Sequence, residues 1–277
     1  MNLEEQIKQW FAEDIGDGDH STLSCIPNEA MGAQKLIVKQ PGIIAGIEIA
    51  KQIFKTFDPT LEVEQFLHDG DEVKPGDIAF IVRGKTQSLL QTERLMLNIM
   101  QRMSGIATRT AEYVRLLEGT RARVLDTRKT TPGLRYLEKL AVKIGGGTNH
   151  RFGLFDMVML KDNHVDHAGG IIQAIDRTNT YLKDTGKNLK IEIEVRNLDE
   201  LQTVLNHGGV HRIMFDNFTP ELTRKAVKMV AGRYETESSG GITKNTIRSY
   251  AETGVDFISV GALTHSVSSL DLSFKAL

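Results

Sequence analysis

The chain has 277 residues, of which 40% are hydrophobic and 25% charged, and its formal net charge is −2. This is the composition of a globular protein with one large domain or two smaller ones, and the near-neutral charge argues against a nucleic-acid partner. Cys25 is the only cysteine, so no internal disulfide can form, and no apolar run approaches the ~20 residues of a membrane span. Because the N-terminus is unlike a secretory signal, we expect a cytoplasmic protein with no membrane partner.

The first part of the chain predicts a small α+β domain. Apolar residues at helical spacing between Leu3 and Ile15 indicate an opening amphipathic helix. The polar residues 17–22 follow, and we interpret them as a structural loop because they lack the remaining ligands of a calcium loop. Further elements are expected in this order: a strand at 33–39, a helix at 46–57, and strands at 61–67 and 78–82.

Residues 68–77 carry a G-D-x-V-x-x-G-D pattern that is similar to biotinyl or lipoyl carrier domains. Those domains present a modified lysine on an exposed hairpin, and no such lysine context lies nearby. We therefore interpret the segment as a structural hairpin. A long helix is expected over 87–117, with an interruption at Ser104-Gly105.

After Gly119, apolar strand-like runs alternate with helical segments. Strands are expected at 122–126, 157–161, 190–195, 212–216, 234–238 and 257–260. Helices are expected near 134–143, 170–183, 197–206, 220–231 and 243–253. Such alternation predicts a parallel sheet, and the step of 22 residues between the ends of the last four strands favours a (β/α) barrel. Six strands are visible rather than eight.

Polar or charged residues, or Gly, stand at the end of each predicted barrel strand. In chain order they are Asp126 with Arg128, Lys161, Glu194, Asp216, Glu237 with Ser239, and Gly261. Barrel active sites lie at the carboxyl ends of the strands, so the set predicts an active site. Residues 121–164 also hold nine Lys and Arg against four Asp and Glu, which predicts a site for a strongly anionic small molecule.

Glycine-rich loops follow the last two strands, as Ser239-Gly240-Gly241 and as Gly261 with His265 downstream. Such loops after late barrel strands commonly bind phosphate. Arginine suits bidentate recognition of a polyacid, and the carboxylates Glu194 and Asp216 suit Mg²⁺ bound together with substrate phosphates. No serine stands in a nucleophile elbow, and the histidines and the cysteine do not form a zinc motif. His150 and His164 could act in acid–base chemistry or position other groups.

Long stretches of the chain resemble quinolinate phosphoribosyltransferase, also called nicotinate-nucleotide pyrophosphorylase (carboxylating). They are QRMSGIAT, DTRKTTPGLR, EKLAVKIGGGTNHR, LKDNH, ESSGGI and VGALTHS, with EDIGDGDHST near the start. Lys143 stands where this family usually has Arg, and Phe215 where it usually has Leu; neither removes a charge.

The resemblance implies a partly open (β/α) barrel of about six to seven parallel strands and an N-terminal α+β sandwich domain. The first domain is expected over 1–115 and the barrel over 116–267, with the tail 268–277 returning to the first domain. The implied reaction joins quinolinate to phosphoribosyl pyrophosphate and yields nicotinate mononucleotide, pyrophosphate and CO₂, with Mg²⁺ and no organic cofactor.

The resemblance also implies residue roles. Quinolinate would be held by Arg128, His150, Arg151 and Lys161, and Thr127 would also bind substrate. Lys129, Glu194 and Asp216 would face phosphoribosyl pyrophosphate and Mg²⁺, and Lys129, Lys161, Glu194 and Asp216 would be catalytic. The 5′-phosphate would be held by Ser239, Gly240, Gly241, Gly261 and His265. Arg102 of a neighbouring subunit would complete the quinolinate pocket, in a homodimer or a hexamer built as a trimer of dimers.

Three alternatives remain open at this stage. A related phosphoribosyltransferase could use another pyridine acid or belong to the molybdenum-associated relatives that share this fold. A phosphate-binding barrel aldolase would use a Schiff-base lysine, for which Lys161 is the candidate. A carrier or interaction protein without activity is the third reading, and it lacks a modification site.

Overall fold

The computed structural model describes residues 2–277, which form two compact units. The first contains residues up to Ala111, Leu140–Gly145 and Ser266–Leu277. The second contains Glu112–Lys139 and Gly146–His265. In the described chain no helix is long and apolar enough to cross a membrane.

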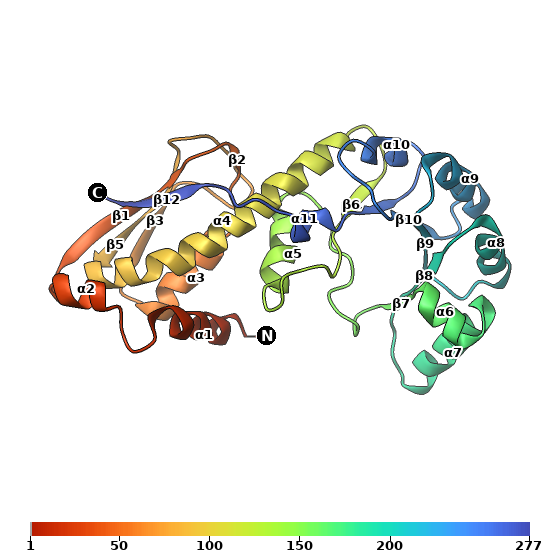
Figure 1. Cartoon of the computed structure of the whole chain (residues 1–277), viewed down its shortest axis with the longest axis horizontal. Coiled ribbons are helices and arrows are strands. Elements are labelled where there is room, and N and C mark those ends of the chain that lie inside the picture. The colour runs from red at the N-terminus through yellow and green to blue at the C-terminus, as the bar shows by residue number, and fades with distance from the viewer. Residues whose placement is uncertain (1) are drawn as a thin grey trace. The chain divides into compact units, whose positions relative to one another are not determined.

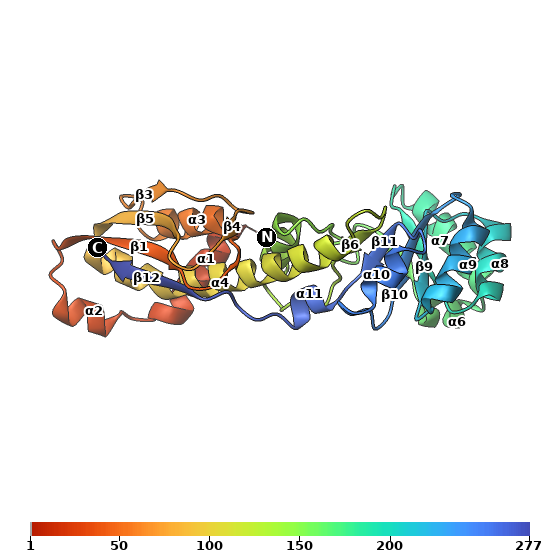
Figure 2. The ribbon, with the colours of Figure 1, turned by 90° about the horizontal axis from the view of Figure 1, so that it is seen from above.

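The first unit is built on a four-stranded antiparallel sheet with the order β12-β1-β5-β3. Figure 2 shows these strands side by side in this order. Its strands are β1 (Met31–Val38), β2 (Gly42–Ile43), β3 (Glu62–Gln65), β4 (Glu72–Val73), β5 (Ile78–Lys85) and β12 (Leu272–Ala276). Its helices are α1 (Leu3–Ile15), α2 (His20–Cys25), α3 (Ile47–Phe57) and most of α4 (Thr86–Leu116). β2 and β4 pair separately.

Aromatic side chains from distant parts of the sequence form the core of this unit. Phe54 of α3 lies 5.9 Å from Phe80 of β5 and 6.2 Å from Phe274 of β12, measured between ring centroids. All three rings are buried, so the C-terminal strand contributes both an edge of the sheet and part of the hydrophobic core.

Two local predictions for the first unit are wrong. α4 runs without interruption through Ser104 and Gly105. Gly105 is needed for close packing instead, because a Cβ there would lie 2.2 Å from the carbonyl oxygen of Ser268. The second wrong prediction is the loop at 17–22, because α2 begins within it at His20. The Asp19 side chain caps this helix by accepting a hydrogen bond from the Thr22 N–H.

The second unit is a six-stranded parallel sheet with the order β6-β11-β10-β9-β8-β7. Its strands are β6 (Arg123–Leu125), β7 (Val158–Leu160), β8 (Ile191–Val195), β9 (Arg212–Asp216), β10 (Glu235–Ser239) and β11 (Phe257–Ser259). All six predicted strands are present, and no pairing joins β6 to β7 in the described chain, so the barrel is open there.

Helices α7, α8 and α9 lie on the outside of the curved sheet, as Figure 1 shows. The helices of this unit are α5 (Arg135–Ile144, up to Lys139), α6 (Asp162–Ala168), α7 (Ile171–Asp184), α8 (Leu198–His207), α9 (Pro220–Val230), α10 (Ile247–Ala251) and α11 (Ala262–His265). α6 was not expected from the sequence; the His164 side chain accepts a hydrogen bond from the Lys161 N–H at its start.

Candidate active site

The inner face of the barrel carries charged residues at alternate positions of β8 and β10 and at both ends of β9, where Met214 lies between them. These are Glu192 and Glu194 of β8, Arg212 and Asp216 of β9, and Glu235 and Glu237 of β10. Side chains two residues apart on a strand share a face. The register aligns Glu192 and Glu235 with Arg212, and Ser239 with Asp216, so the charges lie in layers from the amino ends to the carboxyl ends of the strands.

A pocket of about 250 Å³ lies at the carboxyl ends of these strands. Its lining residues are Thr127, Arg128, Lys129, His150, Arg151, Met159, Lys161, Met214, Glu237, Ser239 and Ser259. Four of them are Lys or Arg and two are methionines. The combination suits a flat, anionic molecule with an apolar face, because cations attract its carboxylates while the thioethers contact the ring.

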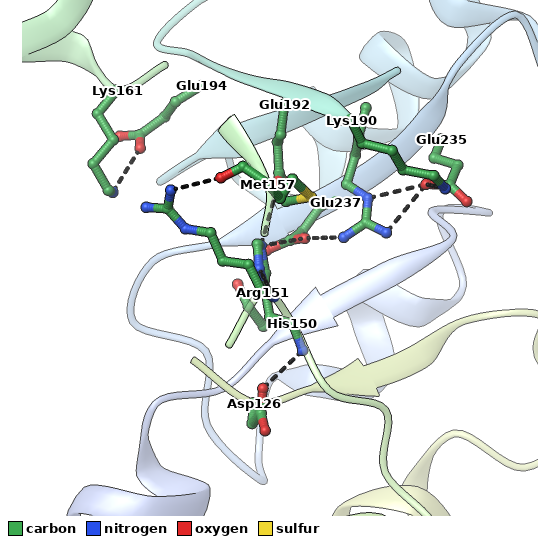
Figure 3. A network of polar contacts seen from close by, with 12 residues as sticks. Asp126, His150, Arg151, Met157, Lys161, Lys190, Glu192, Glu194, Glu235 and Glu237 are labelled. Atoms are coloured by element: carbon green, nitrogen blue, oxygen red, sulfur yellow. Dashed lines mark hydrogen bonds and ion pairs between the residues drawn. The ribbon is translucent and has the colours of Figure 1, made fainter. Parts of the chain in front are cut away.

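Two of the basic side chains are already held in place. Lys161 Nζ lies 3.0 Å from Oε2 of the buried Glu194, and Arg151 donates a hydrogen bond to the Met157 carbonyl at 3.2 Å (Figure 3). Burial, with the neighbouring Arg128 charge, lowers the pKa of Arg151 from its ordinary value. These side chains are therefore oriented before any ligand arrives, which lowers the entropic cost of binding.

A buried ion pair fixes the segment that carries His150 and Arg151. Lys139 Nζ lies 2.5 Å from Asp126 Oδ1, and the same carboxylate accepts a hydrogen bond from the His150 N–H at 2.8 Å. Lys139 also donates to the His150 carbonyl at 3.0 Å. Asp126, which the sequence placed among the residues facing the site, is completely buried and is not among the pocket-lining residues.

His150 lies on the floor of the pocket with both ring nitrogens facing protein groups. Nδ1 accepts the Arg151 N–H at 2.6 Å, and Nε2 lies 3.0 Å from Glu192 Oε2 and 3.5 Å from Glu237 Oε2. Burial lowers the pKa of His150, so the ring is neutral near pH 7, with its proton on Nε2. This geometry makes His150 a positioning group in the present arrangement rather than an acid or base that faces a ligand.

The carboxyl groups of Glu192 and Glu237, which lie beside His150 at the floor of the pocket and are called the floor carboxyls here, resist ionisation. Burial raises the pKa of Glu192 to about 7. Burial, with the neighbouring Glu192 charge, raises the pKa of Glu237 to about 8. The ligand atoms of His150, Glu192 and Glu237 lie within 4.8 Å of one another, a spacing compatible with a metal ion. However, Arg212 Nη1 lies 3.1 Å from Glu237 Oε2, and this positive charge disfavours a cation at that position.

The loop after β10 is a tight cradle. Gly240 and Gly241 have φ values of 104° and 59°, and a Cβ on Gly240 would lie 2.1 Å from Asn217 Oδ1. Only glycine fits at Gly240 for both reasons. After β11, a Cβ on Gly261 would lie 3.1 Å from both the His265 ring and the Lys129 side chain, so these residues also meet.

Glu194 and Asp216 lie on adjacent strands at the pocket side of the barrel. Glu194 is buried against Lys161, while Asp216 is half-buried and accepts a hydrogen bond from the Asn217 side chain at 2.8 Å. Carboxylate oxygens of this kind fit Mg²⁺ that is shared with substrate phosphates.

The structure thus brings most of the predicted site together. Thr127, Arg128, Lys129, His150, Arg151, Lys161 and Ser239 line the pocket, while Glu194, Asp216, Gly240, Gly241, Gly261 and His265 lie on the same strand ends and loops. Arg102 belongs to the first unit, where it is half-buried on α4. Some of the basic residues of the segment 121–164 lie outside the pocket lining. Arg121 pairs with Asp256, Arg123 lies over the Phe257 ring at 5.0 Å, and Lys139 is buried.

Sequence reasoning did not include Glu192, Arg212, Met159, Met214 and Ser259. A signal for one of them existed: in β8 the sequence Ile-Glu-Ile-Glu-Val places Glu192 on the same face as Glu194. Charges at alternate positions of an otherwise apolar strand predict an inward polar face.

A second cleft, of about 510 Å³, lies at the amino ends of the strands. Four of its charged side chains are already ion-paired: Lys190 lies 3.7 Å from Glu235, and Arg121 contacts Asp256. Arg233 donates its hydrogen bonds to backbone carbonyls. His211 Nδ1 accepts the Ile191 N–H. Because barrel active sites lie at the opposite ends of the strands, the smaller pocket is the candidate site.

Comparison with known proteins identifies the family. The model of the quinolinate phosphoribosyl transferase N-terminal domain matches residues 19–104, and that of the C-terminal domain matches residues 106–275. The chain is 44% identical to a chloroplastic nicotinate-nucleotide pyrophosphorylase [carboxylating] from Oryza sativa, over 99% of this chain and 77% of that protein. It is 42% identical to a probable nicotinate-nucleotide pyrophosphorylase [carboxylating] from Bacillus subtilis, over 99% and 93%.

A crystal structure of NadC from Streptococcus pyogenes is similar along the whole length. It has a TM-score of 0.94 and 37% sequence identity, over 99% of this chain and 97% of that one. The chain belongs to the quinolinate phosphoribosyltransferase family.

Proposed function

We propose that this protein is the decarboxylating quinolinate phosphoribosyltransferase of NAD biosynthesis. It joins quinolinate to phosphoribosyl pyrophosphate and releases nicotinate mononucleotide, pyrophosphate and CO₂. The main support for this proposal is a pocket with four cationic side chains at the carboxyl ends of parallel strands. It lies in a chain whose residues 19–104 and 106–275 match the two domains of this family. Its substrates are accordingly a pyridine diacid and a sugar diphosphate.

The basic residues provide recognition of the diacid. Arg128, Arg151 and Lys161 converge on the pocket, and Arg151 is partly desolvated by burial. A charged hydrogen bond in such surroundings is stronger and more directional than one in water. Two carboxylates on neighbouring ring carbons would be held by these groups, with Met159 or Met214 against the ring.

The carboxylates are placed for the sugar. The pyridine nitrogen forms a bond to C1′ of the ribose as the bond from C1′ to the pyrophosphate oxygen breaks. C1′ then develops positive charge, which Glu194 and Asp216 would stabilise. Bound Mg²⁺ would neutralise charge on the departing pyrophosphate, with these two residues as its protein ligands. Lys129 would face the same phosphates, and the Ser239, Gly240, Gly241, Gly261 and His265 cradle would hold the 5′-phosphate.

Decarboxylation follows from the first step. Once glycosylated, the ring nitrogen is cationic, so it stabilises the electron pair left on the adjacent carbon when CO₂ departs. That carbon then takes up a proton. The pocket's contribution is to hold the remaining carboxylate and the ring in position.

The assembly is a further part of the proposal. Arg102 follows the core-facing Ile99 on α4 and precedes buried Met103. We place it in the quinolinate pocket of a neighbouring subunit, in a homodimer or a hexamer made of three dimers. A cytoplasmic location also belongs to the proposal, supported by the exposed thiol of Cys25, which suits a reducing compartment.

The test is substrate consumption. Purified protein with Mg²⁺ and phosphoribosyl pyrophosphate should consume quinolinate, release CO₂ and form nicotinate mononucleotide, and should leave nicotinate unchanged. Consumption of nicotinate in place of quinolinate would assign a different pyridine acid and overturn the proposal.

A further inference from the structure

The floor of the pocket contains a group of buried polar atoms whose hydrogen bonds are incomplete. Glu192 and Glu237 are 0% exposed and His150 is 8% exposed. Among the described residues, Nε2 of His150, both oxygens of Glu192 and Oε1 of Glu237 have no hydrogen-bond partner of good geometry. Buried polar atoms are nearly always satisfied, so four such atoms in one place require an explanation.

The charges at this place are also out of balance. Arg212 Nη1 lies 3.1 Å from Glu237 Oε2, and Arg212 also contacts Glu235 at the amino ends of the strands. Two ionised carboxylates would share this one contacting guanidinium, because Arg151 and Lys161 act on Glu192 more weakly than Arg212 does. Burial of two such charges against one shared cation is strongly unfavourable.

One added proton reduces both problems. A carboxylic acid on Glu237 removes the excess charge and supplies an O–H donor for the neighbouring Glu192 oxygens, which can only accept. Glu237 is the member of the carboxyl pair that lines the pocket, since Glu192 is not among the lining residues. The charge of its carboxyl group therefore lies directly beneath whatever the pocket binds, although the side chain itself is fully buried.

We propose that Glu237 is a specificity-determining residue for the diacid: it retains its proton while the pocket holds a dianion, so that the floor beneath the ligand is neutral at this position. An ionised Glu237 would repel the ligand's carboxylates from below and would compete for the cations that bind them. This inference rests on the proposed function, because it takes a pyridine diacid as the ligand.

The groups that face Glu237 set the direction of the pH dependence. They are Glu192 from β8, Arg212 from β9, Ser259 from β11 and His150 from the loop before β7. Burial, followed by the Glu192 charge, raises the pKa of Glu237 to about 8. Below that pH the acid is neutral and binding is unaffected; as the pH rises through it, Glu237 ionises and dianion affinity falls. One linked proton limits the loss to about tenfold per pH unit.

The experiment is calorimetric titration of the full-length protein with quinolinate alone at pH 6.5, 7.5, 8.5 and 9.0. At pH 8.5 it is repeated in two buffers of different ionisation enthalpy, which measures protons taken up on binding. We expect affinity to fall several-fold between pH 7.5 and 9.0, with net proton uptake at pH 8.5. Glu237→Gln, which keeps a neutral side chain of the same shape, should lose most of the decline in affinity between pH 7.5 and 9.0 and most of the proton uptake at pH 8.5.

Glu235→Gln is the matched control, because Glu235 also contacts Arg212 but does not line the pocket. It should keep the wild-type pH dependence. If Glu237→Gln does not fold, uptake by the wild-type protein still decides the question: quinolinate binding without proton uptake at pH 8.5 overturns the inference. A stoichiometric transition metal in the purified protein that Glu237→Gln loses would also overturn it. Failure of wild type to bind quinolinate at pH 6.5 would instead contradict the proposed function.

Discussion

Lys139 Nζ lies 2.5 Å from Asp126 Oδ1, and both side chains are almost completely buried, with exposed fractions of 2% and 0%. The pair joins the end of β6 to α5, and it also holds the backbone of His150 on both sides, through the N–H and the carbonyl. A buried pair contributes most to the precision of the structure, since its attraction is offset by desolvation. Here that precision applies to the residue next to Arg151, which lines the pocket.

Loss of one partner of this pair should destabilise the barrel unit. Lys139→Met leaves the Asp126 carboxylate buried without its cation and should lower the free energy of unfolding by about 3–5 kcal/mol. Urea denaturation followed by circular dichroism measures the change. The exposed pair of Lys190 with Glu235 provides the control, and Lys190→Met should change stability by less than about 1 kcal/mol. Equal effects of the two substitutions would show that burial does not matter here.

Removal of the Arg151 side chain should weaken quinolinate binding. The guanidinium is partly buried beside Arg128, so its truncation, which leaves a bound carboxylate without this partner, should cost about 2–5 kcal/mol. Titration of Arg151→Ala with quinolinate measures the loss. Arg121→Ala, in the same unit but at the amino-end cleft, should leave the affinity unchanged. Unchanged affinity of Arg151→Ala would remove this residue from the diacid pocket.

Glu194→Gln and Asp216→Asn should lower turnover strongly while quinolinate binding stays largely intact. Both variants keep the shape of the side chain and remove the negative charge that would meet the developing positive charge at C1′. Initial rates across a Mg²⁺ titration, together with quinolinate affinity, separate the two effects. Wild-type turnover in both variants would make these carboxylates structural.

The aldolase alternative predicts a different behaviour of Lys161. A Schiff base needs a neutral amine, whereas Lys161 Nζ is ion-paired with Glu194 at 3.0 Å. Borohydride treatment in the presence of carbonyl substrates should therefore leave Lys161 unmodified by mass spectrometry. A trapped adduct on Lys161 would favour the aldolase.

The shared-site proposal for Arg102 can be tested by mixing two inactive variants. Arg102→Ala and Lys161→Ala damage the same pocket from different chains. A heterodimer holds one pocket with both lesions and one with neither, so random reassortment should restore up to about a quarter of wild-type activity. Subunit exchange is verified with differently tagged chains. Exchange without any return of activity would place Arg102 in the pocket of its own chain.

The sequence by itself determined the architecture and which strand-end residues lie close together. Alternating apolar runs predicted all six parallel strands of the barrel, because a buried parallel sheet requires such runs and short βα loops. Its polar strand ends and glycine loops predicted which residues would meet. Residues that end parallel strands are brought to one edge by the topology alone, which is why Arg128, Lys161 and Ser239 could be expected together.

Only the tertiary structure decided what each charge does. Asp126, Lys139 and Lys161 look alike as charged residues in one basic stretch, yet the first two neutralise each other in the core and the third lines the pocket. The interruption expected at Ser104-Gly105 failed for a similar reason, since Gly105 serves close contact with a segment more than 160 residues away. Burial and pairing depend on neighbours that are distant in sequence, and local pattern carries no information about them. The floor carboxyls show this most clearly, because the pKa of Glu237 depends on the burial that β8, β9 and β11 impose together.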